Sequence, residues 1–176
     1  VLPSTLDLAA AELDLVDVPR KELILREKLN SIRNKYDFII VDCPPALNTL
    51  TINALCAADS AIVPIQCEYY ALEGLTQLLQ TINLVTERMN TALSIEGIVF
   101  TMFDGRTNLS VQVVQNVKDN IDLHIFKTVI PRNVRLAEAP SYGMPVIDYD
   151  PRSSGAEAYM KLAKEVIKLN KKKKKK

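Results

Sequence analysis

One acidic residue, Asp42, directly follows an apolar run and could bind a metal ion. Residues 38–41 are continuous and mostly β-branched, a pattern typical of a strand covered on both faces of a parallel sheet. Pro44 and Pro45 then end the strand. Open α/β sheets bind ligands at the carboxyl ends of their strands, and Mg²⁺ prefers oxygen ligands, so Asp42 is a candidate metal residue. The alternative is that Asp42 caps the following helix.

Helical and strand-like patterns alternate around this residue along the whole chain. This alternation predicts an α/β protein with three layers and a mostly parallel sheet. A polar loop marked by prolines and containing one helical turn is expected at residues 131–143. The predicted helices cover residues 6–13, 20–34, 47–55, 70–90, 111–121 and 155–167, and the predicted strands cover residues 38–41, 60–66, 95–102 and 126–130.

The length and composition of the 176-residue chain predict a single domain. No apolar segment approaches the roughly 20 residues of a membrane span, and the first residues lack the pattern of a signal peptide, so a cytoplasmic protein is expected. Cys43, Cys56 and Cys67 have no metal-ligand spacing and are expected to be reduced thiols. His124 stands alone and is expected to have a structural or surface role.

Positive charge is concentrated at the end of the chain. The net charge is +1, but without Lys171–Lys176 there are 16 basic and 21 acidic residues, which gives −5. We expect a folded portion at residues 1–169 and a disordered lysine tail at residues 170–176. The tail could attract DNA or acidic partners, and its sequence indicates no specific role.

Several longer motifs resemble one family, the ParA/Soj chromosome and plasmid partitioning ATPases, which are P-loop NTPases of the deviant Walker A group. The resemblance runs from about residue 2 to residue 166. Its motifs are the stretch from Asp42 through Pro-Pro to TINAL, then PIQCEYYALEGL, TMFDGRTNLS, KTVIPRNVRLAEAPSYG and YDPRSSGAEAY. The resemblance implies a P-loop NTPase-like fold, here without the N-terminal P-loop region.

By this resemblance, Asp42 is the Walker B carboxylate, which holds the Mg²⁺ of MgATP through water. Pro44 and Pro45 then correspond to the switch that senses the γ-phosphate. The alternative for the proline pair is a rigid turn between strand and helix.

The resemblance also assigns two later loops to the adenine base and the ribose of ATP. They offer apolar surface for the base and polar groups for hydrogen bonds, the usual mixture of a small-molecule pocket. The alternative for each is an ordinary loop residue. The residues are Met102, Phe103, Asp104, Pro131, Arg132 and Asn133.

Arg106 and Arg135 resemble the basic residues with which the family binds DNA nonspecifically after ATP has joined two protomers. Arginine suits phosphate contacts because its guanidinium is a planar fork of donors. The alternative for each is a solvated surface charge. The resemblance further implies a homodimer in the complete protein, a ParB-like partner protein that triggers hydrolysis, association with the nucleoid, and no membrane.

A phosphate-binding loop is missing from these 176 residues. The five glycines are isolated from one another, and no Gly-Lys-Ser/Thr sequence occurs. The chain by itself therefore contains no complete catalytic set, and we expect it neither to bind ATP tightly nor to hydrolyse it. A sheet without its first strand is also expected to expose apolar edges around the Asp42 strand.

Two other functions remain open. One is a MinD-like positioning ATPase, although the end of the chain offers lysines without an extra apolar face for membranes. The other is a non-catalytic module that binds DNA or complete protomers.

Overall fold

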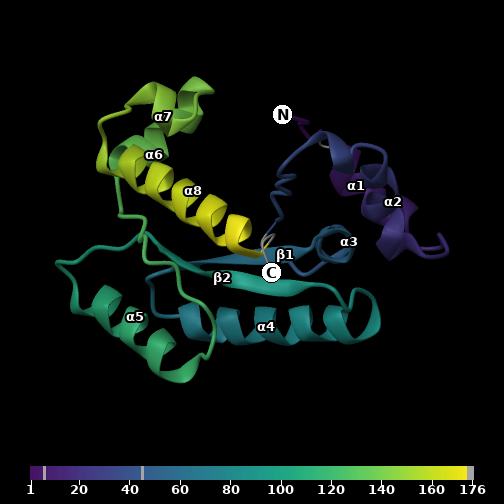
Figure 1. Ribbon diagram of the computed structural model, residues 1–176, viewed down its shortest axis with the longest axis horizontal. Coiled ribbons are helices and arrows are strands. Elements are labelled where there is room, and N and C mark those ends of the chain that lie inside the picture. The colour runs from purple at the N-terminus through teal and green to yellow at the C-terminus, as the bar shows by residue number, and fades with distance from the viewer. Residues whose placement is uncertain (6, 45, 174–176) are drawn as a thin grey trace. The chain divides into compact units, whose positions relative to one another are not determined.

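The computed structural model describes residues 1–5, 7–44 and 46–173 (Figure 1). Contacts divide the chain into two compact units. The first unit contains Val1–Ala61 and Gln77–Ser94, and the second contains Ile62–Thr76 and Ile95–Lys176.

The first unit is built around helix α3 (Thr49–Ala57), which is the most buried helix of this unit. Two buried asparagines connect α3 to its neighbours. Asn53 accepts a hydrogen bond from the Leu25 amide at 3.1 Å and donates one to the Lys21 carbonyl at 2.9 Å. Asn90 donates to the carbonyl of Leu55, at 2.9 Å. The other elements of this unit are α1 (Asp7–Asp14), η1 (Lys21–Leu23), α2 (Ile24–Asn30), η2 (Arg33–Lys35) and the end of α4 (Ala71–Arg88).

The helix predicted at residues 20–34 is broken into three short pieces, η1, α2 and η2. Arg20 precedes the first piece in the left-handed region, with φ at 57°, so the chain turns sharply before the helical segment begins.

The prediction of a buried strand at residues 38–41 is wrong. These residues have no strand assignment and are exposed, and the side chain of Ile40 is 91% exposed. A strand needs a neighbour to accept and donate its backbone hydrogen bonds, and none of the described residues pairs with this segment. The apolar pattern is present, but burial depends on a partner that the described residues do not supply.

The second unit contains a parallel pair of strands, β1 (Ser60–Gln66) and β2 (Ser94–Thr101), joined through α4. Their parallel register is visible at the carboxyl ends, where the Cys67 amide donates to the Thr101 carbonyl at 3.0 Å. The strands match the predicted ranges closely.

A third extended segment runs parallel to β2 in place of the strand predicted at residues 126–130. It forms two isolated bridges, Ile98 with Ile125 and Phe103 with Pro131. The amide of Phe126 donates to the carbonyl of Ile98, and the amide of Ile130 donates to the carbonyl of Phe100. Between these two hydrogen bonds, the segment advances by four residues while β2 advances by two. The two extra residues interrupt the ladder as a bulge does.

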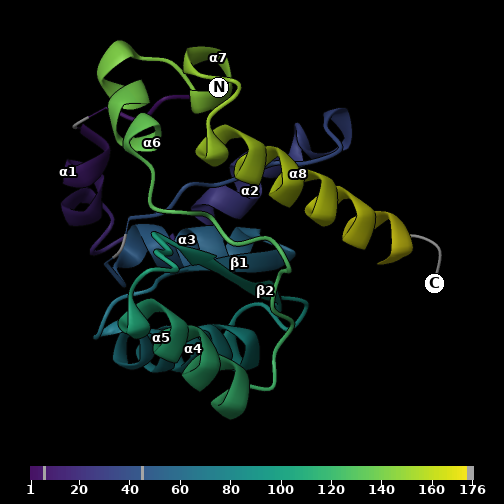
Figure 2. The same ribbon diagram turned by 90° about the vertical axis from the view of Figure 1, so that its left-hand side faces the viewer.

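Helices cover both faces of this sheet, which confirms the α/β fold class. In Figure 1 and Figure 2, α8 (Ser154–Lys173) lies on one side of β2, and α5 (Asn108–Asn120) lies on the other. Val113 and Val117 are the buried apolar residues of α5. The core beneath α8 consists of Val99, Phe126, Ile130 and Ala158, with Leu136, Leu162, Val166 and Leu169 packed against it.

Three short helices lie between the third extended segment and α8. They are α6 (Val134–Glu138), η3 (Ala139–Tyr142) and α7 (Val146–Tyr149). The first two lie within residues 131–143, where the sequence predicted a loop with one helical turn, and the third lies beyond that range. Helix α8 continues to Lys173, beyond the boundary predicted at residue 169, and residues 174–176 lie outside the described part. Among the described residues, no helix combines the length and apolar character needed to cross a membrane.

Candidate nucleotide and nucleic-acid site

The two loops predicted to hold the base and ribose lie side by side in the second unit. Phe103 donates its amide to the Ile130 carbonyl at 3.1 Å, and Arg132 donates its amide to the Phe103 carbonyl at 2.9 Å. Met102, with φ at 54°, turns the chain as it leaves β2. Both loops therefore begin at the same edge of the sheet, where open α/β sheets place their ligands.

Asp104 is held by Arg106 through three hydrogen bonds. Its Oδ1 accepts from the Arg106 amide at 3.1 Å and from Nε at 2.9 Å, while Oδ2 accepts from a terminal guanidinium nitrogen at 2.7 Å. These hydrogen bonds, with the positive charge of Arg106, lower the pKa of Asp104 to about 2. Asp104 is therefore an ionised acceptor at neutral pH, and Arg106, whose side chain is 91% exposed, keeps its remaining donors in solvent.

The loop is continuous with the first turn of α5. Thr107 caps this helix by accepting a hydrogen bond from the Ser110 amide at 3.4 Å, and its hydroxyl donates to the Asp104 carbonyl at 3.0 Å. Ser110 donates to the Cys67 carbonyl, at 3.5 Å, at the end of β1. The side chain of Asp104 is thus placed by a loop attached to both β1 and β2.

Asn133 has a structural role that the sequence did not reveal. Its Oδ1 accepts from the Arg135 amide at 2.8 Å and caps α6, and its Nδ2 donates to the Ser154 hydroxyl at 2.8 Å. Both ends of the amide are therefore engaged in joining α6 to α8. The neighbouring Arg132 lies 3.9 Å from Glu68, an exposed pair that contributes little to stability.

Arg135, the second predicted DNA-binding residue, lies between two carboxylates. One terminal nitrogen donates to Glu138 at 2.8 Å, and Nε is 3.3 Å from Asp150. Tyr149 also donates to Glu138 at 3.3 Å and stacks on Tyr142, with ring centroids 5.0 Å apart. Both predicted DNA-binding arginines are therefore paired with carboxylates in this structure.

Asp42 and Pro44 belong to the first unit, and both are exposed. Burial, and then the nearby charge of Asp42, raise the pKa of the Cys43 thiol. Among the described residues, no group of three or more His, Cys, Asp or Glu side chains could hold a metal ion. Asp42 therefore offers one carboxylate, which fits Mg²⁺ only together with water and phosphate oxygens, the ligands that this ion usually keeps in nucleotide sites. Pro45 lies outside the described residues.

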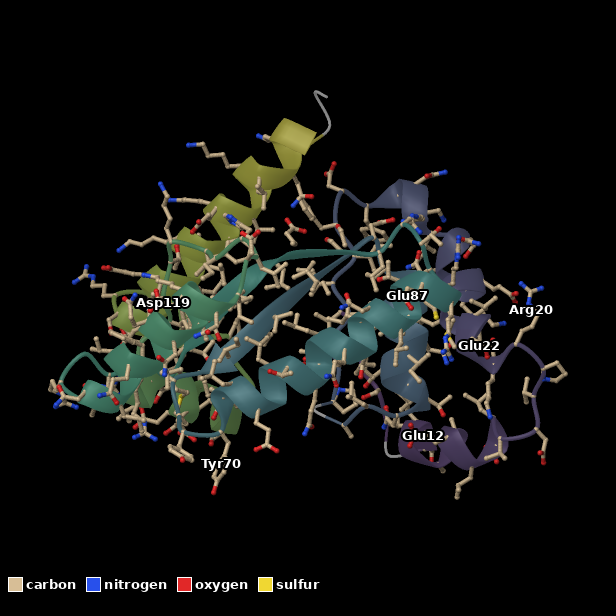
Figure 3. All side chains as sticks on the ribbon, turned by 90° about the horizontal axis from the view of Figure 1, so that it is seen from below. Glu12, Arg20, Glu22, Tyr70, Glu87 and Asp119 are labelled. Atoms are coloured by element: carbon tan, nitrogen blue, oxygen red, sulfur yellow. The ribbon has the colours of Figure 1, made fainter. Side chains whose placement is uncertain are left out.

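Sequence reasoning also missed a groove between the start of α4 and α5. It has a volume of about 380 Å³ and is flanked by Tyr69 and Tyr70, whose rings meet edge to face at 5.2 Å. Figure 3 shows the Tyr70 side chain projecting away from the ribbon. The only sequence signal was the pair of adjacent tyrosines. The other lining residues are Leu72, Glu73, Leu109, Gln112, Val113 and Asn116.

Comparison with known proteins defines the class of this chain. A family model described as an AAA domain matches residues 1–95. The chain therefore belongs to this AAA domain family.

Curated relatives confirm the resemblance to ParA/Soj proteins that the motifs indicate. The chain is 57% identical over 166 residues to the sporulation initiation inhibitor protein Soj of Bacillus subtilis, covering 94% of this chain and 66% of that protein. It is 51% identical over 168 residues to the chromosome partitioning protein ParA of Myxococcus xanthus, covering 96% of this chain and 59% of that protein. The chain thus spans less than two thirds of the length of these relatives.

Solved structures with the same fold include nucleotide-bound enzymes. The cobyrinic acid a,c-diamide synthase of Mycobacterium smegmatis, with bound ADP and magnesium, has a TM-score of 0.82 and 35% identity, covering 97% of this chain and 62% of that chain. The cell division ATPase MinD of Pyrococcus furiosus has a TM-score of 0.69 and 27% identity, covering 84% of this chain and 59% of that chain.

Proposed function

We propose that this chain is part of a ParA/Soj-type partitioning ATPase, in which it supplies the base-binding loops, the Walker B carboxylate and DNA-binding arginines. The observation that carries the proposal is the hydrogen-bonded pairing of the loops at residues 102–104 and 131–133 at the carboxyl edge of a parallel sheet. The identity to Soj and ParA proteins along nearly the whole chain supports the same function.

In this proposal, Met102, Phe103 and Pro131 provide apolar surface for an adenine ring. Asp104 is ionised at neutral pH and accepts a hydrogen bond from a ribose hydroxyl or an adenine amino group. Asn133 positions its loop by capping α6, and Arg132 offers guanidinium donors at the rim. The ADP found in the mycobacterial enzyme supports an adenine nucleotide as the ligand class.

Magnesium belongs to the complete site in this proposal. Asp42 would hold it through water, with phosphate oxygens and further residues completing the octahedral shell. Pro44 and Pro45 would carry the γ-phosphate switch.

We further propose that the complete protein is a nucleotide-dependent homodimer that binds DNA nonspecifically through Arg106 and Arg135 and responds to a ParB-like partner. Association with the nucleoid would follow from DNA binding. Phosphate oxygens can replace the carboxylates that hold both arginines here, because a guanidinium pairs with either anion in the same forked geometry.

Filter binding to a random-sequence duplex across a salt series tests the DNA part of this proposal. The double variant Arg106→Ala/Arg135→Ala should reduce the slope of log K against log salt by about two, because each lost arginine removes about one phosphate contact. Arg26→Ala/Arg88→Ala is the control, since it removes the same charge from exposed helical positions of the first unit. Equal slopes for both double variants would contradict the assignment.

The same assay separates the ATPase from a non-catalytic module. DNA affinity that rises with MgATP when the chain is supplied with complete ParA/Soj-type protomers supports the ATPase. If neither MgATP nor complete protomers change the affinity of the chain for DNA, the result supports a non-catalytic DNA-binding module.

A further inference from the structure

We propose that the exposed face of α8 is a second surface for duplex DNA, on which Lys161, Lys164, Lys168 and Lys171 contact phosphates. This inference rests on the proposed DNA-binding function but uses residues other than Arg106 and Arg135. We call these four residues the lysine row.

The lysine row follows from the helical register of α8. Its members are separated by three, four and three residues, the spacing that places side chains on one face of a helix. Ten residues from the first to the last lysine correspond to about 15 Å along the helix axis. All four side chains are exposed. The continuation of α8 to Lys173 brings the start of the C-terminal lysine run into this row (Figure 1).

Contacts on the opposite face of α8 fix the rotation of the helix about its axis. Leu162, Val166 and Leu169 pack against the core that contains Val99 and Phe126. The last described turns are therefore held to the sheet by apolar contacts.

Polar contacts add to this anchoring. The carboxylate of Glu165 accepts from the Lys127 amide at 2.8 Å and from the Thr128 amide at 3.1 Å. Asn170 donates to the buried Glu96 of β2. Because the helix is anchored along its length, the lysine row is already oriented toward solvent before any ligand binds, which lowers the ordering cost of binding.

The charge of the lysine row is largely uncompensated. Lys161 lies 3.8 Å from Glu157, and both side chains are mostly exposed, so this pair is weak. Lys164, Lys168 and Lys171 form no ion pair with any carboxylate in the described part of the chain. Arg106 and Arg135, in contrast, are each held by carboxylates.

The composition of this face favours DNA over a membrane surface. Leu162, Val166 and Leu169 of α8 are used for packing on the sheet. The large apolar side chains that the described part of α8 leaves exposed are Tyr159, Met160 and Ile167, at 43%, 46% and 42%. Membrane binding by a helix needs a larger free apolar face. About 15 Å of duplex carries roughly nine phosphate charges, enough for all four lysines.

The triple variant Lys161→Gln/Lys164→Gln/Lys168→Gln of the 176-residue chain tests the proposal in the filter-binding salt series. Glutamine keeps the helix propensity and removes the charge. We expect the slope of log K against log salt to fall in magnitude by about three, with at least a tenfold loss of affinity at about 0.1 M salt. The control Lys28→Gln/Lys35→Gln/Lys118→Gln removes the same charge from exposed positions elsewhere and should change the slope by less than one. Circular dichroism checks that both variants fold.

An unchanged slope in the lysine-row variant, or an equal loss in the control, would overturn the inference while leaving Arg106 and Arg135 as DNA contacts. If the slope falls by about three in the lysine-row variant but is unchanged in Arg106→Ala/Arg135→Ala, the result would support the lysine row. It would contradict the assignment of Arg106 and Arg135 as DNA contacts. No binding of the unmodified chain to duplex DNA would overturn the lysine row. It would leave Arg106 and Arg135 in place, because their contacts are proposed for the nucleotide-dependent dimer of the complete protein. Tighter binding to vesicles of phosphatidylserine and phosphatidylcholine than to DNA would also overturn the inference.

Discussion

Asp104 accepts three hydrogen bonds from Arg106, so the carboxylate proposed to face the nucleotide holds the arginine proposed to face DNA. A similar link joins Asn133 to the amide of Arg135 in the neighbouring loop. In both loops, the two residues are two positions apart. Any ligand that draws Asp104 away from Arg106 therefore changes the positive charge available at the same loop.

Asp104→Asn should tighten DNA binding. The substitution removes the carboxylate that neutralises Arg106, so the guanidinium no longer has to leave Asp104 before it contacts a phosphate. The affinity for duplex DNA should therefore rise, while the salt slope stays similar because the number of phosphate contacts is unchanged. The salt series by filter binding measures this change. Asp119→Asn, on an exposed turn of α5, is the control for the loss of one negative charge (Figure 3). Weaker binding by Asp104→Asn than by the control would contradict the role of this pair.

Glu165 should make stability depend on pH through its contacts with residues 127 and 128. Burial opposes ionisation, but hydrogen bonds from the Lys127 amide and from the Thr128 hydroxyl and amide outweigh it and lower the pKa of Glu165 below its usual 4.5. A lowered pKa means that this stabilisation is present above the unfolded value and is lost as pH falls through the folded value. Denaturant unfolding should therefore show a free energy that decreases as pH falls below about 5.

The variant Glu165→Gln should lose about 1–2 kcal/mol of stability at pH 7, because charge-assisted hydrogen bonds become neutral ones. It should also have a shallower pH dependence below pH 5 than the unmodified chain. Identical pH profiles for the two proteins would show that Glu165 does not anchor α8.

Two glycines in helices should respond to alanine in opposite directions. A Cβ at Gly155 would lie 2.6 Å from Cγ of Leu136, so Gly155→Ala should push α8 away from α6 and cost about 1–3 kcal/mol. Gly74 in α4 has no atom within 4 Å of such a Cβ, so Gly74→Ala should stabilise the helix by about 0.5–1 kcal/mol. Thermal unfolding of both variants measures the difference. A stabilised Gly155→Ala would show that α6 and α8 are not closely packed.

The 176-residue chain should not hydrolyse ATP by itself. Its glycines are isolated from one another in the sequence, and no Gly-Lys-Ser/Thr occurs. Asp42 is exposed, and it belongs to no group of three or more metal-ligating side chains in the described part of the chain. A phosphate-release assay with MgATP measures turnover. Magnesium-dependent turnover that Asp42→Ala abolishes would contradict this expectation.

The sequence predicted the parts of the fold that depend on local pattern. The periodicity of α4, α5 and α8 and the apolar runs of β1 and β2 each appear in the structure near the predicted bounds. Residues 38–41 have an equally clear strand pattern and yet are exposed, because a strand also needs a partner that its own sequence does not specify.

The candidate site was predicted less completely than the fold. The resemblance identified both loops, and the structure joins them through Phe103 and Arg132. The resemblance did not identify the capping role of Asn133, although an asparagine just before a helical pattern is an N-cap signal. The pairing of Arg135 with Asp150 could not be read from spacing, because the chain must first turn through α6 and α7 to bring them together.

A titration of the isotope-labelled chain with adenosine, followed by NMR, tests the proposed base site most directly. Adenosine needs no phosphate cradle, so it isolates the contribution of the paired loops. We predict saturable shifts concentrated in the amides of residues 101–107 and 130–135, weaker shifts with uridine, and loss of the adenosine response in Phe103→Ala. Shifts spread over the whole chain, or a response to uridine equal to that of adenosine, would contradict the assignment of these loops to the nucleotide.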